Sequence, residues 1–319
     1  MVSKDSKKTV YLYGMYKIPL FLLKCVMRLL GALPLGFHYA CGRVLSWLAG
    51  DVLRYRRDVV TTNLARSFPG LKYNELKAVR KDFYRHFGDL FAEAVWFGGC
   101  RGPRRLRRQH IVELKNPELL NHLYDVSPSV MIFNSHCGNW ELFGGTSYYN
   151  YVDGLELSIT EANVRVVYKK MSSRVWDEFF KANRIAPLKD RDSFEGLIET
   201  REIMRYALSH KGEKLFYNLN TDQGPYKGST GIDVGEFLHQ HTYSMAGGAT
   251  LAHKLHMSVV YMNMSVRERG HYDLTFTTIC EDASTMSVED IMKSYYSLLQ
   301  KDIEAQPANY LWTHKRWKI

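Results

Sequence analysis

Hydrophobic and polar positions divide the chain into two parts with different patterns. Apolar and aromatic residues dominate residues 10–53, punctuated by the cations Lys17, Lys24, Arg28 and Arg43. The longest uncharged run, residues 29–42, has 14 residues, whereas a membrane-spanning helix needs about 20 apolar residues. This pattern predicts a helical hairpin, broken near residues 34–36, that lies in or dips into a membrane surface. The alternative is an ordinary buried pair of helices.

After residue 53, amphipathic helical patterns alternate with short apolar runs that are typical of strands. Helical patterns cover residues 53–66, 74–97, 117–124, 172–183, 194–209, 244–256 and 288–303. Strand patterns cover residues 111–114, 130–133, 155–160, 164–168, 215–218, 258–263 and 271–278. The alternation predicts an α/β fold with a mixed, mostly parallel sheet flanked by helices, in which the last strand is an antiparallel edge. The predicted division is an N-terminal membrane-anchoring helical segment, residues 1–53, followed by one domain, residues 54–319.

The clearest candidate chemistry follows the strand predicted at residues 130–133. His136 lies where this strand ends, and Gly138 and Asn139 have turn chemistry. Asn139 is also suited to cap a following helix. Glu141 comes five residues after His136.

This spacing has a chemical meaning only because a turn separates the two residues. On a continuous helix, residues five apart point about 140° away from each other. With a strand end and a turn between them, the chain can fold Glu141 back toward the His136 imidazole. A carboxylate on one ring nitrogen would fix the tautomer and leave the other nitrogen as a general base. The alternative is a structural histidine beside a capping glutamate.

Two more polar segments follow predicted strands. Asp222 comes after the strand at residues 215–218, and functional groups of α/β sheets collect just past strand ends. His136 and Asp222 both lie at such a place, although an Asx turn also explains Asp222. Lys169 and Lys170 follow the strand at residues 164–168, where a solvated pair is the alternative.

Several other reaction classes find little support in the sequence. The five cysteines show no paired or metal-binding spacing, and no His-Glu-x-x-His pattern occurs, so we predict neither a metal nor a cofactor. Ser135 and Cys137 flank His136, but neighbours on an extended chain point to opposite faces, which disfavours a serine or cysteine hydrolase. No Gly-x4-Gly-Lys loop is present, which argues against nucleotide hydrolysis.

The charge pattern indicates an anionic partner. The formal net charge is +10, and a basic patch is predicted at Arg101, Arg104, Arg105, Arg107 and Arg108. Such a patch suits phosphates or an acidic protein, with a solvated charge run as the alternative. Residues 306–319 interleave aromatic and cationic side chains, which suits lipid phosphates. Nucleic acid is not predicted, because no nucleic-acid-binding signature accompanies these residues.

Taken together, these segments resemble the late acyltransferases of lipid A biosynthesis, the lauroyl/myristoyl transferase family of the lysophospholipid acyltransferase superfamily. The resemblance covers nearly the whole chain and includes the family's His-x4-Asp/Glu motif at His136 and Glu141. The other matching segments are residues 54–57, 63–64, 68–69, 168–170, 183–184, 222–223, 237–242 and 310–318. Two departures concern the acceptor more than the chemistry. Lys169 replaces the family's usual arginine, and residues 241–243 replace a Pro-Thr-Ala that many relatives have.

The resemblance implies transfer of a fatty acyl group to a hydroxyl of a lipid A precursor, at the cytoplasmic face of the bacterial inner membrane. The implied donor is an acyl carrier protein thioester or, less usually, acyl-coenzyme A. His136 would be the general base, oriented by Glu141. Lys169, or the backbone N–H groups of the turn at Cys137 and Gly138, would stabilise the oxyanion. Further substrate-binding residues implied by the match are Asn139, Arg184, Asp222 and Gln223.

Other functions stay open on the sequence alone. An acyltransferase of the same superfamily that acts on another amphiphile, such as an aminolipid or a glycolipid, would share these motifs. A thioesterase would use water in place of the alcohol. A non-catalytic membrane-binding protein would use the arginine cluster without the histidine.

Overall fold

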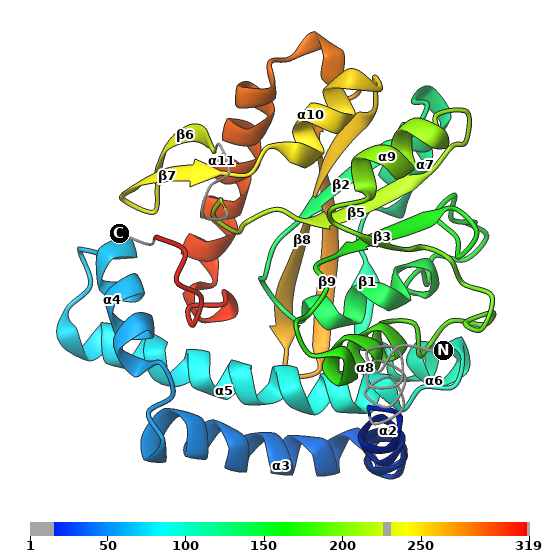
Figure 1. Cartoon of the computed structure of the whole chain (residues 1–319). Coiled ribbons are helices and arrows are strands. Elements are labelled where there is room, and N and C mark those ends of the chain that lie inside the picture. Colours follow the sequence, from blue (N-terminus) through cyan, green and yellow to red (C-terminus); the bar gives the residue numbers. More distant parts are fainter. Residues whose placement is uncertain (1–15, 226–230, 318–319) are drawn as a thin grey trace, which may run out of the picture.

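A seven-stranded sheet forms the centre of the computed structural model, which describes residues 16–225 and 231–317 (Figure 1). The strand order is β1-β9-β8-β2-β5-β3-β4. The strands are β1 (Val112–Leu114), β2 (Val130–Asn134), β3 (Val164–Tyr168), β4 (Leu197–Glu199), β5 (Phe216–Asn220), β8 (Ser258–Glu268) and β9 (His271–Cys280). Every neighbouring pair is parallel except β8 and β9. The predicted mixed, mostly parallel sheet is therefore confirmed. The last strand, β9, is antiparallel to β8 as predicted, but it is not an edge, because β1 pairs with its other side.

Helices cover both faces of the sheet (Figure 1). The α-helices are α2 (Lys17–Gly31), α3 (Leu35–Trp47), α4 (Arg57–Ser67), α5 (Tyr73–Gly98), α6 (Pro103–Gln109), α7 (Pro117–Val126), α8 (Arg174–Arg184), α9 (Ile203–Ser209), α10 (Gly247–Lys254) and α11 (Val288–Ala305). A π-helical turn, η1 (Leu48–Val52), extends α3, and short 3-10 helices form η2 (Trp140–Tyr148), η3 (Ala283–Thr285) and η4 (Pro307–Asn309). Most helices predicted from periodicity are present within a few residues of their expected ends.

The core consists of two layers, one on each side of β2, whose five residues are all buried. Met131 and Phe133 belong to the cluster that includes α10 and α11, and Phe133 contacts the Tyr295 ring edge to face. Val130 and Ile132 belong to the other cluster, with α7 and η2. Because successive side chains of a strand point to opposite faces, a strand buried on both faces reads as a continuous apolar run.

Three segments differ from the sequence prediction. Residues 155–160 are not a strand, because asparagine side chains satisfy their backbone: Asn150 donates to the Leu155 carbonyl at 2.6 Å, and Asn121 accepts from the Ser158 N–H at 2.7 Å. Residues 194–209, predicted as one helix, divide into β4 and α9, since residues 197–199 pair with β3. The hairpin of β6 (Ile232–Phe237) and β7 (Gln240–Ser244) was not predicted.

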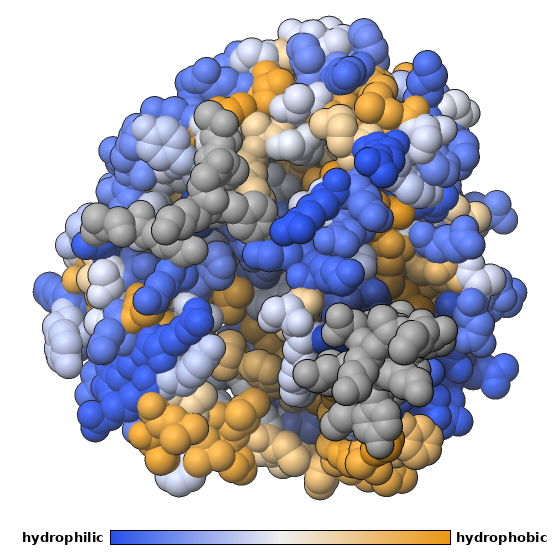
Figure 2. All heavy atoms as spheres, viewed as in Figure 1, coloured by the Kyte–Doolittle hydropathy of each residue, from blue (hydrophilic) through white to orange (hydrophobic). Residues whose placement is uncertain are grey.

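The N-terminal part is a helical hairpin, as predicted, with its break between Gly31 and Leu35. Among the described residues, no helix taken alone has the length and apolar character to cross a bilayer. Residues 17–31 and 35–52 meet those criteria only as a pair bent by 115°. Apolar side chains on α2 and α3 face outward, including Phe21 (65% exposed) and Trp47 (56% exposed). Figure 2 shows the resulting hydrophobic band along the lower edge of the molecule, over α2 and α3.

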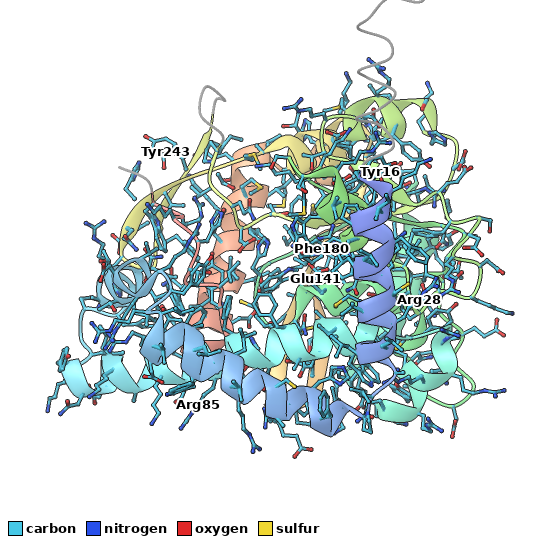
Figure 3. All side chains as sticks on the ribbon, turned by 60° about the horizontal axis from the view of Figure 1, so that its bottom comes forward. Tyr16, Arg28, Arg85, Glu141, Phe180 and Tyr243 are labelled. Atoms are coloured by element: carbon cyan, nitrogen blue, oxygen red, sulfur yellow. The ribbon has the colours of Figure 1, made fainter. Side chains whose placement is uncertain are left out.

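Glycines allow this hairpin to pack closely onto α5, which it crosses in Figure 3. A Cβ atom on Gly42 of α3 would lie 2.8 Å from the carbonyl oxygen of Gly88 on α5. A Cβ atom on Gly31 of α2 would lie 2.6 Å from the Cα of Gly99, just past the end of α5. The backbones therefore touch at two points, where no side chain has room.

Replacement of Gly42 by alanine is expected to destabilise the protein by about 1–3 kcal/mol, because the added methyl group pushes α3 away from α5. Gly36, also on α3, provides a matched control, since a Cβ atom there meets nothing within 4 Å. Gly36→Ala should be neutral or stabilising by up to about 1 kcal/mol. Chemical denaturation of the purified variants measures both effects, and equal shifts of the two midpoints would contradict the backbone contact.

Candidate active site

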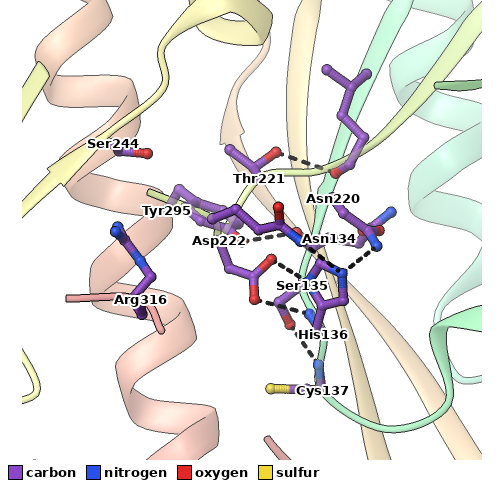
Figure 4. A network of polar contacts seen from close by, with 12 residues as sticks. Asn134, Ser135, His136, Cys137, Asn220, Thr221, Asp222, Ser244, Tyr295 and Arg316 are labelled. Atoms are coloured by element: carbon purple, nitrogen blue, oxygen red, sulfur yellow. Dashed lines mark hydrogen bonds and ion pairs between the residues drawn. The ribbon is translucent and has the colours of Figure 1, made fainter. Parts of the chain in front are cut away.

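The candidate site lies where β2 and β5 end side by side. Their last residues, Asn134 and Asn220, are partners in the parallel register, so His136 and Asp222 each follow two residues later. The Nδ1 atom of His136 lies 2.7 Å from Asp222 Oδ1, and the His136 backbone N–H donates to Asp222 Oδ2 at 3.2 Å (Figure 4). One carboxylate thus holds both the ring and the backbone of the histidine.

The charge of Asp222 is well compensated even though only 3% of its side chain is exposed. Burial raises the pKa of the Asp222 carboxyl, but the charge of His136 and its hydrogen bonds outweigh this effect and hold that pKa below its ordinary value. The Arg316 guanidinium contributes in the same direction. An ionised Asp222 accepts a hydrogen bond from the Nδ1–H group, which leaves Nε2 with its lone pair.

Two side-chain amides face the Nε2 atom of His136. The Nδ2 of Asn220 lies 3.4 Å from it and the Nε2 of Gln223 lies 3.3 Å from it. The Trp140 ring contacts the imidazole edge to face, with 4.8 Å between centroids. About one tenth of the His136 side chain is exposed, at 11%. Gln223 was predicted from sequence, whereas Asn220, the last residue of β5, was missed although it begins the same polar segment.

Glu141 pairs with Arg184 instead of orienting His136, contrary to the sequence-based expectation. Its two carboxylate oxygens accept hydrogen bonds from Arg184 Nε at 3.2 Å and Nη2 at 3.1 Å. Figure 3 shows Glu141 next to Phe180 of α8, beside α2. The reason lies in the topology: adjacent parallel strands bring Asp222 to Nδ1, while η2 places Glu141 against α8.

The turn after His136 is held by the protein itself. The Gly138 N–H donates to both the backbone and the side-chain oxygen of Asn309, at 3.0 and 2.9 Å. The Cys137 N–H donates to Ser135 Oγ at 3.2 Å. Both N–H groups that were expected to bind an oxyanion therefore already have acceptors. Gly138 is required here, because its φ is +62° and a Cβ atom would lie 2.5 Å from the Met264 side chain.

Asn139 connects the turn to α5 and is 1% exposed. Its Nδ2 donates to the Leu90 carbonyl at 3.3 Å and to Glu93 Oε2 at 2.9 Å. The hydroxyls of Tyr272 and Tyr39 also donate to Glu93, at 2.7 and 2.8 Å. These contacts favour a structural role for Asn139 over the predicted substrate contact, and its side chain does not cap η2. Burial raises the pKa of Glu93 to about 7, although three hydrogen bonds oppose the shift.

The remaining predicted residues lie around this centre. Lys169 is exposed just past the end of β3, two strands away from β2. In the basic patch, Arg101, Arg104, Arg107 and Arg108 are exposed. Arg105 is partly buried and serves the fold, because its Nη2 donates to the Leu33 carbonyl at 2.9 Å and its Nη1 donates to the Gly31 carbonyl at the end of α2.

The buried cation Arg316 was missed as a site residue, although its motif was noticed in the C-terminal segment. It is 6% exposed and donates to the Tyr296 hydroxyl at 2.8 Å and the Tyr243 carbonyl at 2.9 Å.

Burial raises the pKa of the Cys137 thiol far above its ordinary value, so this residue is not a thiolate. Within the described part of the chain, no group of three His, Cys, Asp or Glu side chains is placed to hold a metal ion.

Residues 5–319 of the chain match the family model described as "Bacterial lipid A biosynthesis acyltransferase". A search of the curated proteins finds no match.

Replacement of Glu93 by glutamine should change how stability depends on pH. Between about pH 4.5 and 7 the native carboxyl of the wild type holds a proton that the unfolded chain has lost, so wild-type stability falls as pH rises. The glutamine of the variant does not titrate, so its free energy of unfolding does not fall in this way. The free energy of unfolding of the variant minus that of the wild type should therefore increase by up to roughly 3 kcal/mol from pH 4.5 to 8. Denaturation midpoints measured across this range test it, and parallel curves for the two proteins would contradict it.

Proposed function

Because the chain belongs to the bacterial lipid A biosynthesis acyltransferase family, we propose that His136 and Asp222 catalyse transfer of a fatty acyl group from a thioester to a hydroxyl of a lipid A precursor. Family membership makes the protein an acyltransferase. The observation that carries the proposed mechanism is the 2.7 Å contact between His136 Nδ1 and Asp222, which leaves Nε2 facing two amide donors.

An alcohol needs a base as it attacks a thioester, because its own pKa lies far above neutrality. In the proposed first step, His136 Nε2 accepts the proton of the acceptor hydroxyl while the oxygen forms a bond to the thioester carbon. Asp222 keeps the Nδ1–H in place and stabilises the imidazolium that results. Its low pKa ensures that it is ionised when the histidine takes up the proton.

The second step breaks the carbon–sulfur bond. The tetrahedral intermediate carries negative charge on the former carbonyl oxygen, and donors aimed at such an oxygen contribute roughly 3–4 kcal/mol in other acyl transfers. We assign this role to the amides of Asn220 and Gln223, because they lie 3.4 and 3.3 Å from His136 Nε2, next to where the hydroxyl would attack. The N–H groups of the turn already donate to acceptors of the protein, and Lys169 is the third donor in the proposal. Collapse expels the thiolate, which takes the proton from His136 Nε2 and leaves an ester and a free thiol.

A cleft next to the site suits the phosphates of the acceptor. Gly224, which directly follows Gln223, is one of the residues that line this cleft. The lining also includes the cations Arg66 and Lys315 and the histidines His239 and His241. No carboxylate belongs to the part of this wall that the structure describes. The phosphates of a diphosphorylated disaccharide would pair there with Arg66 and Lys315.

The donor and the membrane are recognised by other surfaces in this proposal. The exposed arginines of the basic patch match an acidic acyl carrier protein, which is the proposed donor in preference to acyl-coenzyme A. The hydrophobic band on α2 and α3 would embed in the cytoplasmic leaflet of the bacterial inner membrane. Glu141 and Arg184 would form one wall of the site as an ion pair.

Purified protein, mixed with an acyl carrier protein thioester and a lipid A precursor, should produce the acylated precursor, as detected by mass spectrometry. His136→Ala is expected to reduce this activity by at least roughly 100-fold, since the general base is lost, while the variant still binds membranes. Full activity of the variant would make His136 a structural residue. Acylation of an aminolipid or glycolipid alone would favour the other acceptor class, and free fatty acid without acceptor would indicate a thioesterase.

Asp222→Asn should lower kcat by roughly 100- to 10,000-fold with little change in KM, because the amide no longer stabilises the imidazolium.

Glu141→Gln and Arg184→Gln should behave alike, and their double variant should lose no more activity than the worse single variant, since the two residues act as one pair. Steady-state kinetics of the four variants measures both effects. A double variant far below either single variant would show that Glu141 acts independently of Arg184.

A further inference from the structure

A second basic cleft lies outside the catalytic centre, where the end of α3 and η1 pack against the first half of α5. Seven Lys or Arg side chains and only two carboxylates line it. Figure 3 looks toward this face and shows Arg85 beside the crossing of α3 and α5. The cleft is therefore a concentrated positive region, to which the start of α4 and the turn after β8 also contribute Arg57 and Arg269.

Most of this charge has no counterion among the residues that the structure describes. One of the two carboxylates, Asp89, is neutralised by Arg269, with Oδ1 2.5 Å from Nη2. Arg85 pairs with Asp82 at 2.8 Å on the exposed surface. For the other five cations, Arg43, Arg57, Lys77, Arg80 and Lys81, no carboxylate of residues 16–225 or 231–317 lies within the ion-pair distance of 4.0 Å.

Arg80 is the most informative of these cations, because it is 8% exposed. Its Nη1 donates to the Thr61 hydroxyl at 2.9 Å, which satisfies one of five donors and none of the charge. Buried guanidinium groups are almost always paired with an anion. The planar fork of arginine matches two oxygens of a phosphate. Arg80, which is buried and has no carboxylate partner in the described part of the chain, therefore points to a bound phosphate.

The rim of the cleft is apolar and indicates where that phosphate comes from. Trp47 lines the cleft and is 56% exposed, and Val44 and Leu53 nearby are 55% and 73% exposed. In Figure 2 the hydrophobic band over α3 borders a hydrophilic region over α4 and the start of α5. Aromatic, apolar and cationic side chains in this order are typical of the headgroup layer of a membrane.

The cleft is separate from the catalytic centre. Its cations on α5 lie between Lys77 and Arg85, in the first half of the helix, whereas the active-site turn is bonded to Leu90 and Glu93 in the second half. We propose that this cleft binds the phosphate of an anionic bilayer lipid, at a site distinct from the acceptor site. The proposal rests on the proposed membrane association of α2 and α3.

The test compares binding of the full chain to vesicles of phosphatidylcholine containing roughly one third phosphatidylglycerol. Arg43→Gln/Lys81→Gln removes two exposed cations of the cleft, and Arg80→Lys keeps the charge but loses the fork. Lys211→Gln/Lys254→Gln is the matched control, with the same loss of charge after α9 and at the end of α10, away from the band. Co-sedimentation should show at least about fivefold weaker binding for both cleft variants and less than about twofold for the control.

If Arg80→Lys has an unchanged thermal midpoint and binds the vesicles as well as the wild type does, the proposal is overturned. Such binding would show diffuse electrostatic attraction, which depends on the positive charge and not on the planar guanidinium group. Soluble dihexanoyl phosphatidic acid should raise the thermal midpoint of the wild type but not of Arg80→Lys. An equal rise with inorganic phosphate would show an unspecific anion site and overturn the lipid assignment.

Acyl transfer in neutral detergent separates this site from the catalytic one. The two cleft variants should keep the wild-type kcat and KM for the acceptor, since no bilayer lipid is needed there. A raised KM would assign the cleft to the phosphate of the acceptor and overturn the proposal. Vesicle binding requires no chemistry, so it succeeds or fails independently of the proposed acyl transfer.

Discussion

The hydrogen-bonded contact between His136 and Asp222 depends on the register between β2 and β5. A slip by one residue would turn every side chain of β2 to the opposite face and separate the pair. That slip is prevented because β2 is buried on both faces, with Phe133 against α11 and Val130 in the other core layer. The packing of the core thus sets the geometry of the site, although neither core layer contains a reacting group.

Helix α5 links the parts of the molecule that have separate tasks. Near its middle, Gly88 lies in backbone contact with Gly42 of the N-terminal hairpin. Within the next five residues, Leu90 and Glu93 accept hydrogen bonds from Asn139, which lies beside the proposed catalytic histidine. The proposed membrane-facing surface and the active-site turn are therefore attached to one rigid element, which would hold the site at a constant depth relative to the lipid surface.

The buried ionisable groups differ in how their charge is compensated. Asp222 has a cation and two hydrogen bonds, and its pKa lies below the ordinary value. Glu93 has three hydrogen bonds but no ion pair with any described residue, and its pKa rises to about 7. Arg80 donates one hydrogen bond to the Thr61 hydroxyl and has no anionic partner among the described residues. Only the first arrangement suits a group that must stay charged during catalysis, while the last leaves room for a ligand.

The sequence by itself determined the elements whose pattern is local. The periodicity of α5 and α11, the apolar run of β2 and the polar residues after it are all readable there, because helix and strand periods depend on neighbours in the chain. The family motifs also pointed to His136 as the base. Only the tertiary structure decided which carboxylate holds that base, since His136 and Asp222 are 86 residues apart and meet through strand pairing. It likewise decided that Asn309 accepts the hydrogen bond of the Gly138 N–H, which was expected to bind an oxyanion. It also decided that Arg80 is buried without a carboxylate partner among the described residues. Such contacts join segments whose spacing in the chain carries no periodic signal.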